Sequence, residues 1–198
     1  MKKLTLLTLG LFTGAMAVLT AILASCTTPT PQPAPQAEIS KDSLVKRGEY
    51  LVQVMGCDDC HSPKQMGPQG PEVIADRRLS GYQAGRPLPK TDPASIQNGW
   101  VMFNSDLTAS YGPWGVSFAA NLTPDSTGIG VWTEEQFKKA LREGKFKGLD
   151  NNRPLLPPMP WANFRHLTDV DIKAIYSYLH SIRPVKNVVP AWIPPATK

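Results

Sequence analysis

The sequence carries its most informative stretch at Cys57-Asp58-Asp59-Cys60-His61. Two cysteines separated by two residues and followed at once by a histidine form the attachment signature of a c-type haem. Each thiol can add across one vinyl group of the haem as a thioether, and the next residue is then held beneath the iron. We therefore expect Cys57 and Cys60 to bind one haem covalently and His61 to be an axial ligand of its iron.

Two other interpretations of the motif fit the chain less well. A zinc site needs about four ligands, often in paired units, whereas the chain has three cysteines and three histidines. A thioredoxin-like redox motif follows a strand, but residues 42–55 have the periodicity of an amphipathic helix. Asp58 and Asp59, between the two thiols, are interpreted as part of a solvated turn.

The N-terminus has the features of a targeting segment. Two lysines precede an uncharged, mostly apolar run over residues 4–24, which is the order found in secretory signals. Leu23-Ala24-Ser25-Cys26 resembles the lipobox of bacterial lipoproteins, which implies a signal peptide over residues 1–25 and a lipid on Cys26. The alternatives are an uncleaved anchor, since about 20 apolar residues can span a bilayer, and a secreted form cut at Ala-x-Ser.

A proline-rich segment separates this leader from the rest of the chain. Residues 27–37 contain four prolines and no charge, a composition that favours an extended, semi-rigid spacer. We therefore expect residues 26–40 to form a tether and residues 41–198 to form one domain. The net charge of +5, or +3 without the two leader lysines, gives no reason to expect nucleic acid as a partner. The sequence shows neither an internal repeat nor a further membrane span.

Three segments have the hydrophobic periodicity of helices, namely residues 41–55, 133–143 and 168–182. The first contains Gly48, which disfavours a helix interior by about 1 kcal/mol relative to Ala and so indicates that another backbone comes close. The second begins with a capping box between Thr133 and Gln136 and is expected to stop at Gly144. The third is capped by Thr168 and has an apolar stripe on one face.

The segment between the motif and residue 121 is rich in Gly, Pro and aromatic residues. Its aromatic content argues against disorder. We expect residues 100–103 and 116–118 to pair as short strands across residues 104–106. This pairing would add one short β-hairpin to a domain that is otherwise mainly α.

A second ligand for the iron is offered by Pro157-Pro158-Met159-Pro160-Trp161. The prolines limit backbone motion around Met159, which favours a weak thioether ligand, and His/Met ligation raises the reduction potential of a c-type haem. His166 is the main competing ligand, and His180 is interpreted as a surface residue late in the last helix. Three other methionines are assigned to packing or are weaker candidates: Met55, Met66 and Met102.

The order of these features resembles that of a class I cytochrome c. The resemblance covers most of residues 41–186 and includes the first helix, the haem motif, the middle helix preceded by a Trp, the Pro-Met loop and the last helix. Three stretches, 121–125, 130–137 and 157–161, resemble bacterial monohaem cytochromes c and the cytochrome subunits of periplasmic dehydrogenases. In bacteria this family attaches its haem outside the cytoplasmic membrane, which agrees with the leader. The choice between inner and outer membrane stays open.

The resemblance also implies roles for individual residues. Gly48, with Ile175 and Tyr178, matches the close crossing of the first and last helices in the family. Trp132 matches a Trp whose indole N–H bonds a haem propionate. Asn121, the first residue of a stretch similar to the family, is carried over as a cofactor-binding residue.

These features predict an electron carrier rather than an enzyme, because a His/Met-ligated iron has no vacant position. The expected partners are redox proteins: a dehydrogenase, an oxidase or another cytochrome. The alternative is a haem enzyme or gas-binding haem protein whose sixth position is open or labile. A third hypothesis is a subunit of a dehydrogenase or oxidase complex. The segment over residues 62–120 is longer than in compact members of the family, so the exposed haem edge is not assigned.

A basic run follows the start of the predicted middle helix. Five positive charges lie within ten residues and are offset in that run only by Glu143: Lys138, Lys139, Arg142, Lys145 and Lys147. Such a run is most often a solvated helix face. The sharper hypothesis is a docking patch that steers an acidic partner toward the haem edge. Without such a role, the aromatic segment over residues 82–118 is the next candidate contact surface.

Overall fold

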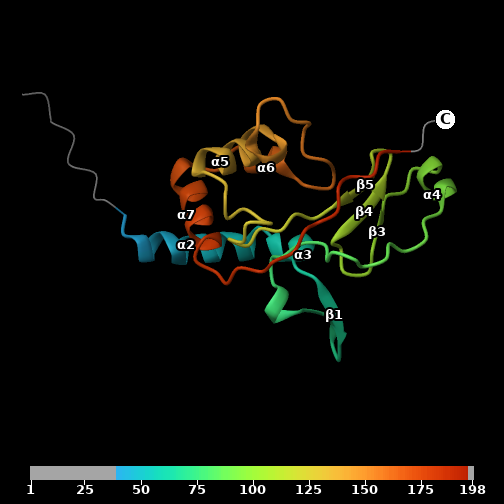
Figure 1. Cartoon of the computed structure of the whole chain (residues 1–198), viewed down its shortest axis with the longest axis horizontal. Coiled ribbons are helices and arrows are strands. Elements are labelled where there is room, and N and C mark those ends of the chain that lie inside the picture. Colours follow the sequence, from blue (N-terminus) through green and yellow to red (C-terminus); the bar gives the residue numbers. More distant parts are fainter. Residues whose placement is uncertain (1–38, 196–198) are drawn as a thin grey trace, which may run out of the picture. The chain divides into compact units, whose positions relative to one another are not determined.

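A computed structural model describes residues 39–195 (Figure 1), and the predicted signal peptide and the tether up to residue 38 lie outside the described residues. The described part forms one unit of mixed, mainly helical structure. Its helices are α2 (Lys41–Val54), α3 (Cys57–His61), α4 (Pro93–Gln97), α5 (Glu134–Glu143), α6 (Trp161–Phe164) and α7 (Asp169–Leu179), with 3-10 turns η1 (Ala75–Arg77) and η2 (Phe146–Gly148). Within residues 39–195, no helix is both long enough and apolar enough to cross a membrane.

Two small antiparallel sheets occupy the segment between the haem motif and residue 121. One is the hairpin of β1 (Lys64–Gly67) and β2 (Gly70–Val73), which the sequence analysis did not predict. The other contains β3 (Met102–Phe103), β4 (Ala109–Gly112) and β5 (Gly115–Phe118) in that order.

The predicted pairing of residues 100–103 with residues 116–118 is wrong, because β4 lies between β3 and β5. The cause is a tight turn after β3. The Asp106 carboxylate accepts hydrogen bonds from the Thr108 backbone N–H and from the Asn104 side chain, so the chain returns at once. The next turn reaches Gly115 with φ +88°, a backbone conformation that favours glycine, and leads into β5.

Helix α2 forms as the sequence predicts and packs along α7. Ser40 caps it by accepting a hydrogen bond from the Ser43 N–H, and its buried residues recur on one face at helical spacing. Gly48 lies where the two helices cross. A Cβ atom at this position would lie 2.0 Å from the carbonyl oxygen of Ala174 and 2.7 Å from Cβ of Tyr178. The predicted close crossing at Gly48 is therefore confirmed, with Ala174 rather than Ile175 as the nearest residue.

The termini of α5 and α7 test the capping predictions. Thr133 and Gln136 form the predicted capping box, and Gly144 ends α5 with φ +64°. Thr168 caps α7, but this helix ends at Leu179, three residues before the predicted end. After Leu179 the last turn tightens, because the Ser181 N–H donates to the carbonyl of Tyr178, three residues back rather than four, at 2.8 Å.

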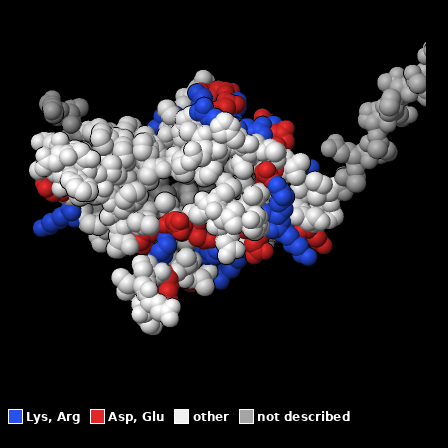
Figure 2. Space-filling model, turned by 180° about the vertical axis from the view of Figure 1, so that it is seen from behind, with Lys and Arg blue, Asp and Glu red and all other residues white. Residues whose placement is uncertain are grey.

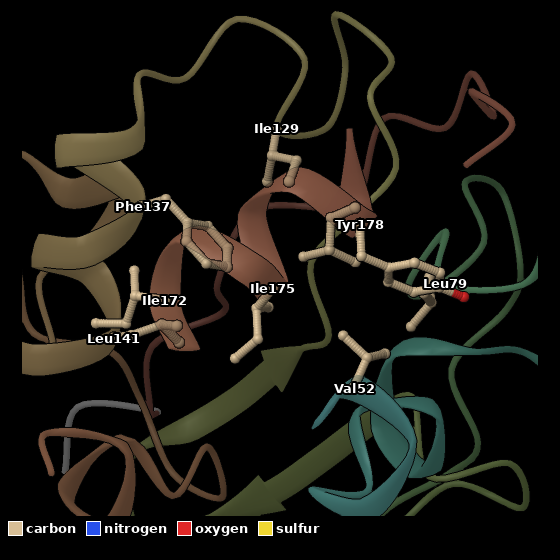
Figure 3. Packing of buried hydrophobic residues seen from close by; sticks show 9 residues of the cluster. Val52, Leu79, Ile129, Phe137, Leu141, Ile172, Ile175 and Tyr178 are labelled. Carbon is tan, nitrogen blue, oxygen red and sulfur yellow. The ribbon is translucent and has the colours of Figure 1, made fainter. Parts of the chain in front are cut away.

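The hydrophobic core lies between α2, α5 and α7 (Figure 3). Each fully buried aliphatic side chain contributes about 1.5–3 kcal/mol to the free energy of unfolding. The buried cluster consists of Val52, Leu79, Ile129, Phe137, Leu141, Ile172, Ile175, Tyr178 and Leu179. Cys57, Trp132 and Met159 are partly buried and pack against this cluster. The arrangement is consistent with the class I cytochrome c fold.

Candidate haem attachment site

The two cysteines of the motif lie on α3, directly after the end of α2. Gly56 links the helices with φ +69°, a conformation that glycine adopts without strain. Because Cys57 and Cys60 are three residues apart on a helix, their side chains lie on the same face. Both thiols are free and half-buried. The local fold therefore presents the two attachment residues side by side, with the histidine one position further on.

Burial makes both thiols weak acids. It raises the pKa of Cys57 to about 11, with the nearby Asp58 carboxylate adding to the effect. Burial also raises the pKa of Cys60, with Asp59 acting in the same direction and the Lys64 ammonium opposing it. Reactive cysteines of redox motifs have lowered pKa values instead. The electrostatics at α3 therefore favour an attachment role over a thiol–disulfide redox role.

His61 is buried, with only 8% of its surface exposed. Its Nδ1 atom lies 2.8 Å from the carbonyl oxygen of Ala120. Because a carbonyl can only accept, Nδ1 carries the proton and donates it, which leaves the lone pair of Nε2 free. A metal-bound imidazole is usually oriented by this kind of hydrogen bond. Burial also lowers the pKa of His61 and so favours the neutral ring that binds metals.

Asn121 fixes the backbone next to Ala120, the residue whose carbonyl oxygen accepts the hydrogen bond from His61. Asn121 is 3% exposed, and its Oδ1 accepts hydrogen bonds from both the N–H and the hydroxyl of Thr123, at 2.9 and 2.7 Å. Its Nδ2 donates to the carbonyl of Val185 at 2.8 Å. The polar atoms of Asn121 are thus bonded to protein partners. They fix the backbone beside Ala120, and the predicted contact of Asn121 with the cofactor stays a prediction.

The Asp58 carboxylate is part of an ion-pair network, so its interpretation as a solvated turn residue is wrong. Arg78 donates to it from Nη2 at 2.6 Å and from Nε at 3.0 Å, and Ser62 donates to it at 2.6 Å. The third guanidinium nitrogen of Arg78, Nη1, donates to the hydroxyl of Tyr178 on α7 at 2.6 Å. Asp59 is exposed, as predicted. Asp58 therefore ties the haem motif to the last helix.

Met159 lies in the Pro-rich loop that precedes α6. Its side chain is half-buried and packs against the same cluster as Cys57 and Trp132. The loop is attached to the sheet, because the hydroxyl of Ser117 on β5 donates to the carbonyl of Pro157 at 2.7 Å. The structure therefore gives the predicted thioether ligand a supported position next to the core.

The two competing histidines lie in different settings. His166 is exposed in the turn between α6 and α7. His180 caps the C-terminal end of α7 and is half-buried, with its ring 4.1 Å from that of Tyr176, so its interpretation as a surface residue is wrong. Its Nε2 is buried without a hydrogen-bond partner among residues 39–195, and burial lowers the pKa of the ring.

Trp132 stands immediately before the cap of α5. It is half-buried against the core, and its backbone carbonyl accepts a hydrogen bond from the Tyr176 hydroxyl at 2.8 Å. Its indole N–H has no protein acceptor in the described part of the chain. The indole is thus available for the predicted propionate contact, which stays a prediction.

The basic run on α5 is largely compensated by carboxylates from outside the run. Lys138 and Arg142 both contact Asp169, at 3.1 and 2.7 Å, and Lys139 contacts Asp150 at 2.7 Å. Figure 2 shows blue and red atoms next to each other rather than one broad positive region on the face drawn. Within the run only Glu143 carries a negative charge, and the fold brings Asp150 and Asp169 next to it.

Comparison with known proteins finds relatives among the cytochrome c subunits of dehydrogenases. No family model matches the chain. The chain is 32% identical over 148 residues to the gluconate 2-dehydrogenase cytochrome c subunit of Pantoea cypripedii, which covers 74% of this chain and 25% of that protein. It is 30% identical over 168 residues to the fructose dehydrogenase cytochrome subunit of Gluconobacter japonicus, covering 84% of this chain and 26% of that protein.

A third relative is the cytochrome c subunit of the alcohol dehydrogenase (quinone) of Gluconobacter oxydans. It is 29% identical over 154 residues, which cover 77% of this chain and 24% of the relative. The chain thus spans about a quarter of the length of these relatives. Over most of its own length, the chain resembles the cytochrome c subunits of dehydrogenases.

Proposed function

We propose that this chain is an electron-transfer protein that holds one haem c through Cys57, Cys60 and His61. The observation that carries the proposal is the buried His61, whose Nδ1 proton is committed to Ala120 so that Nε2 is left as a metal ligand. The resemblance to cytochrome c subunits of dehydrogenases supports the same cofactor and the same class of partner. A bound haem c supplies one-electron exchange between ferric and ferrous iron.

The protein's own contribution is attachment, orientation and burial. The two thiols hold the cofactor covalently, and the Ala120 carbonyl orients the His61 ring. Met159 is the proposed sixth ligand, supported by its flanking prolines and by the anchoring of its loop to Ser117. If His61 and Met159 both held the iron, no position would be left for a substrate or a gas, and the chain would act as an electron carrier rather than as an enzyme.

Covalent attachment is tested by haem staining of denaturing gels. The parent protein should give a haem band, and the Cys57→Ala/Cys60→Ala variant should give none. Asp59→Ala is a matched control, because Asp59 is an exposed residue within the same motif. A haem band that persists in the double variant would refute the attachment site.

The sixth ligand is tested by absorption spectra of the oxidised and reduced protein, with and without carbon monoxide. Met159→Ala should open the iron, lower the reduction potential and allow carbon monoxide to bind, while His166→Ala should keep the parent spectrum. Survival of the ferric Met–iron charge-transfer band in Met159→Ala would assign the ligand to another residue. Carbon monoxide binding by the parent would favour a gas-binding haem protein or a haem enzyme instead.

The proposed partner is a dehydrogenase outside the cytoplasmic membrane, with a lipid on Cys26 as the membrane anchor. The dehydrogenase is supported by the names of the relatives, and the lipid by the lipobox-like Leu23-Ala24-Ser25-Cys26. Mass spectrometry of membrane-extracted protein should detect an acylated N-terminal Cys26, and Cys26→Ser should release the protein or stall its processing. An unmodified N-terminus at another residue would refute the lipid anchor.

A further inference from the structure

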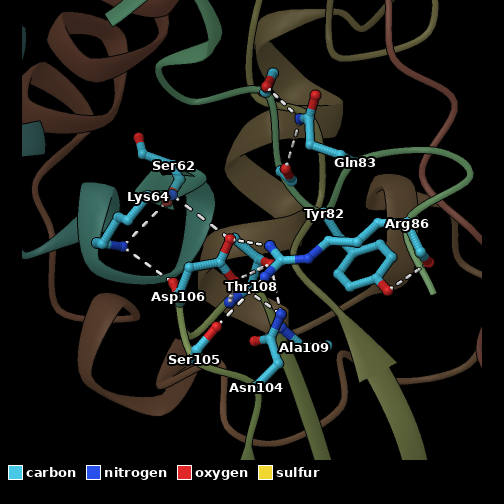
Figure 4. Close-up of polar contacts among 12 residues, drawn as sticks. Ser62, Lys64, Tyr82, Gln83, Arg86, Asn104, Ser105, Asp106, Thr108 and Ala109 are labelled. Carbon is cyan, nitrogen blue, oxygen red and sulfur yellow. Dashed lines mark hydrogen bonds and ion pairs between the residues drawn. The ribbon is translucent and has the colours of Figure 1, made fainter. Parts of the chain in front are cut away.

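Lys64 places its ammonium group among the backbone carbonyls at the end of the haem-attachment helix. Its Nζ lies 3.1 Å from the carbonyl oxygen of Asp58, 2.6 Å from that of Asp59 and 3.0 Å from that of Ser62. A fourth carbonyl, of Asp106, lies at 3.1 Å. An ammonium has three protons to donate, so the hydrogen-bonding capacity of Lys64 is fully used by these oxygens. Figure 4 shows Lys64 between Ser62 and Asp106.

Three of these four oxygens belong to the C-terminal end of α3 and the residue after it. The last carbonyls of a helix have no partner within the helix, and the negative end of the helix dipole favours a cation there. Helix α3 has only five residues, so most of its carbonyls depend on groups from outside the helix. Lys64 therefore stabilises the geometry of the short helix that carries both cysteines and His61.

The fourth oxygen is held rigidly by a separate polar cluster. The Asp106 carboxylate is paired with Arg86 and accepts hydrogen bonds from Thr108 and Asn104, at 2.7 and 2.8 Å. Asp106 is 2% exposed. The same carboxylate accepts a hydrogen bond from the Lys64 backbone N–H at 3.5 Å, while the Lys64 ammonium contacts the backbone carbonyl of Asp106.

The charge of Lys64 is not neutralised by a carboxylate. Asp58 is paired with Arg78, Asp106 is paired with Arg86, and Lys64 makes no ion pair within residues 39–195. The ammonium lies close to the haem-binding residues, since two of the carbonyls that it contacts belong to Asp58 and Asp59, the residues between Cys57 and Cys60. Lys64 is therefore a positive charge fixed by carbonyl oxygens next to the attachment motif, whereas the Asp59 carboxylate, which also makes no ion pair within residues 39–195, is exposed and screened by solvent.

We infer that Lys64 is a positioning residue that holds the haem-attachment helix in place and raises the reduction potential of the haem. This inference rests on the proposed function. A fixed positive charge opposes the extra positive charge of ferric iron and so favours the ferrous state, and the charge and solvent exposure around a haem are established determinants of its potential.

The experiment compares three variants of the haem-loaded protein. Lys64→Met removes the charge at similar length, Lys64→Arg keeps the charge, and Lys90→Met removes an exposed lysine of the same segment as a matched control. In Lys64→Met, the ferrous-to-ferric ratio at a fixed ambient potential should fall by roughly threefold to tenfold, and a tenfold change corresponds to about 59 mV for one electron. Lys64→Arg and Lys90→Met should stay closer to the parent.

A parent-like potential in Lys64→Met, together with a parent-like absorption spectrum, would overturn the inference. Loss of covalent haem in Lys64→Met with its recovery in Lys64→Arg would support the positioning role. The parent protein tests the proposed function separately. Absence of covalent haem in the parent would refute that function, but it would leave the contacts between Lys64 and the four carbonyl oxygens unaffected.

A second measurement needs no variant. The folded, haem-loaded parent is treated with an amine-acetylating reagent, and the acetylated fraction of each lysine is measured by mass spectrometry. The Lys64 ammonium, bonded to four carbonyls, should react at least tenfold more slowly than the exposed Lys90. Equal acetylation rates at the two lysines would show that the four carbonyl oxygens do not hold the Lys64 ammonium.

Discussion

The Nδ1 atom of His61 donates a hydrogen bond to the carbonyl oxygen of Ala120, a residue 59 positions away in sequence. This bond joins the haem motif to the end of the segment that contains both sheets. Asn121 and Thr123 then fix the backbone that carries this carbonyl. The long segment between the motif and residue 121 therefore helps to orient His61, the proposed axial ligand.

The Asp58–Arg78 pair should be needed for a stable attachment helix. Replacing Asp58 by Asn removes the negative partner of a half-buried guanidinium, and we expect the free energy of unfolding to fall by about 1–3 kcal/mol. Asp59→Asn changes the exposed neighbour and should alter it by less than about 0.5 kcal/mol. Urea unfolding followed by circular dichroism measures both. Equal stabilities of the two variants would contradict the structural role of the pair.

The helix crossing at Gly48 should not tolerate a side chain. Helix propensity alone would make Gly48→Ala stabilising by about 1 kcal/mol, but the added Cβ would lie 2.0 Å from the Ala174 carbonyl oxygen. Overpacking of this kind costs about 1–3 kcal/mol, so we expect a net loss of stability and a larger loss for Gly48→Val. Thermal unfolding of these variants and of Glu49→Ala, an exposed control on α2, tests this. A more stable Gly48→Ala would refute the close crossing.

The sequence predicted those features that depend on neighbouring residues. The haem motif, the capping box of Thr133 and Gln136, and the stop at Gly144 are local patterns, because each is defined within a few residues of one helix. The close crossing at Gly48 was also predictable, since a glycine in a helix interior has a cost that only packing explains. The three helices of the core were predicted because the hydrophobic periodicity of each is also a local pattern.

Long-range partners were missed. The acceptor for His61 is a backbone carbonyl, and since every residue has one, its identity at Ala120 follows only from the fold. Arg78 looks like any exposed arginine until the chain brings it to Asp58. The pairing of β3 was mispredicted because the turn at Asp106 depends on side-chain hydrogen bonds that hydrophobic periodicity does not show. The contacts of Lys64 with Asp106 and of Asp169 with Lys138 and Arg142 were missed for the same reason, because the fold brings together residues that are distant in sequence.

The basic run on α5 should contribute little to electrostatic steering. Asp169 forms ion pairs with Lys138 and Arg142, and Asp150 forms one with Lys139. These carboxylates offset most of the positive charge of these three side chains. We expect Lys138→Gln/Lys139→Gln to change the rate of oxidation by ferricyanide, an anionic oxidant, by less than about twofold at low and at high salt. Stopped-flow measurement across ionic strength tests this. A large decrease seen only at low salt would instead support the docking patch.

The free energy of unfolding of the same double variant serves as a control for the rate comparison. Exposed ion pairs of this kind contribute little to the free energy of unfolding, because solvent screens them. The double variant should therefore unfold close to the parent, which allows any change in rate to be assigned to charge rather than to a change in fold.

Asp171 should make the stability of the chain depend on acid pH. Its carboxylate is bonded to Arg47 on α2 at 2.5 Å and to the Thr168 hydroxyl at 2.8 Å. Burial alone would raise the pKa of Asp171, but these two partners outweigh it and hold the pKa below its ordinary value of about 3.9. The contacts in the folded protein thus stabilise the ionised form of the Asp171 carboxyl group over its protonated form.

The sign of the pH effect follows from this lowered pKa. Stability from the Asp171 contacts is fully present above about pH 4 and is lost as pH falls through the lower pKa of the folded state. Asp171→Asn should therefore lower the free energy of unfolding by about 1–2 kcal/mol at pH 7, and its difference from the parent should shrink toward pH 2–3. Glu49→Gln, an exposed control on α2, should show no such trend. Urea unfolding at several pH values measures the difference, and a deficit of Asp171→Asn that is equally large at pH 7 and at pH 2–3 would show that the charge of Asp171 is not its cause.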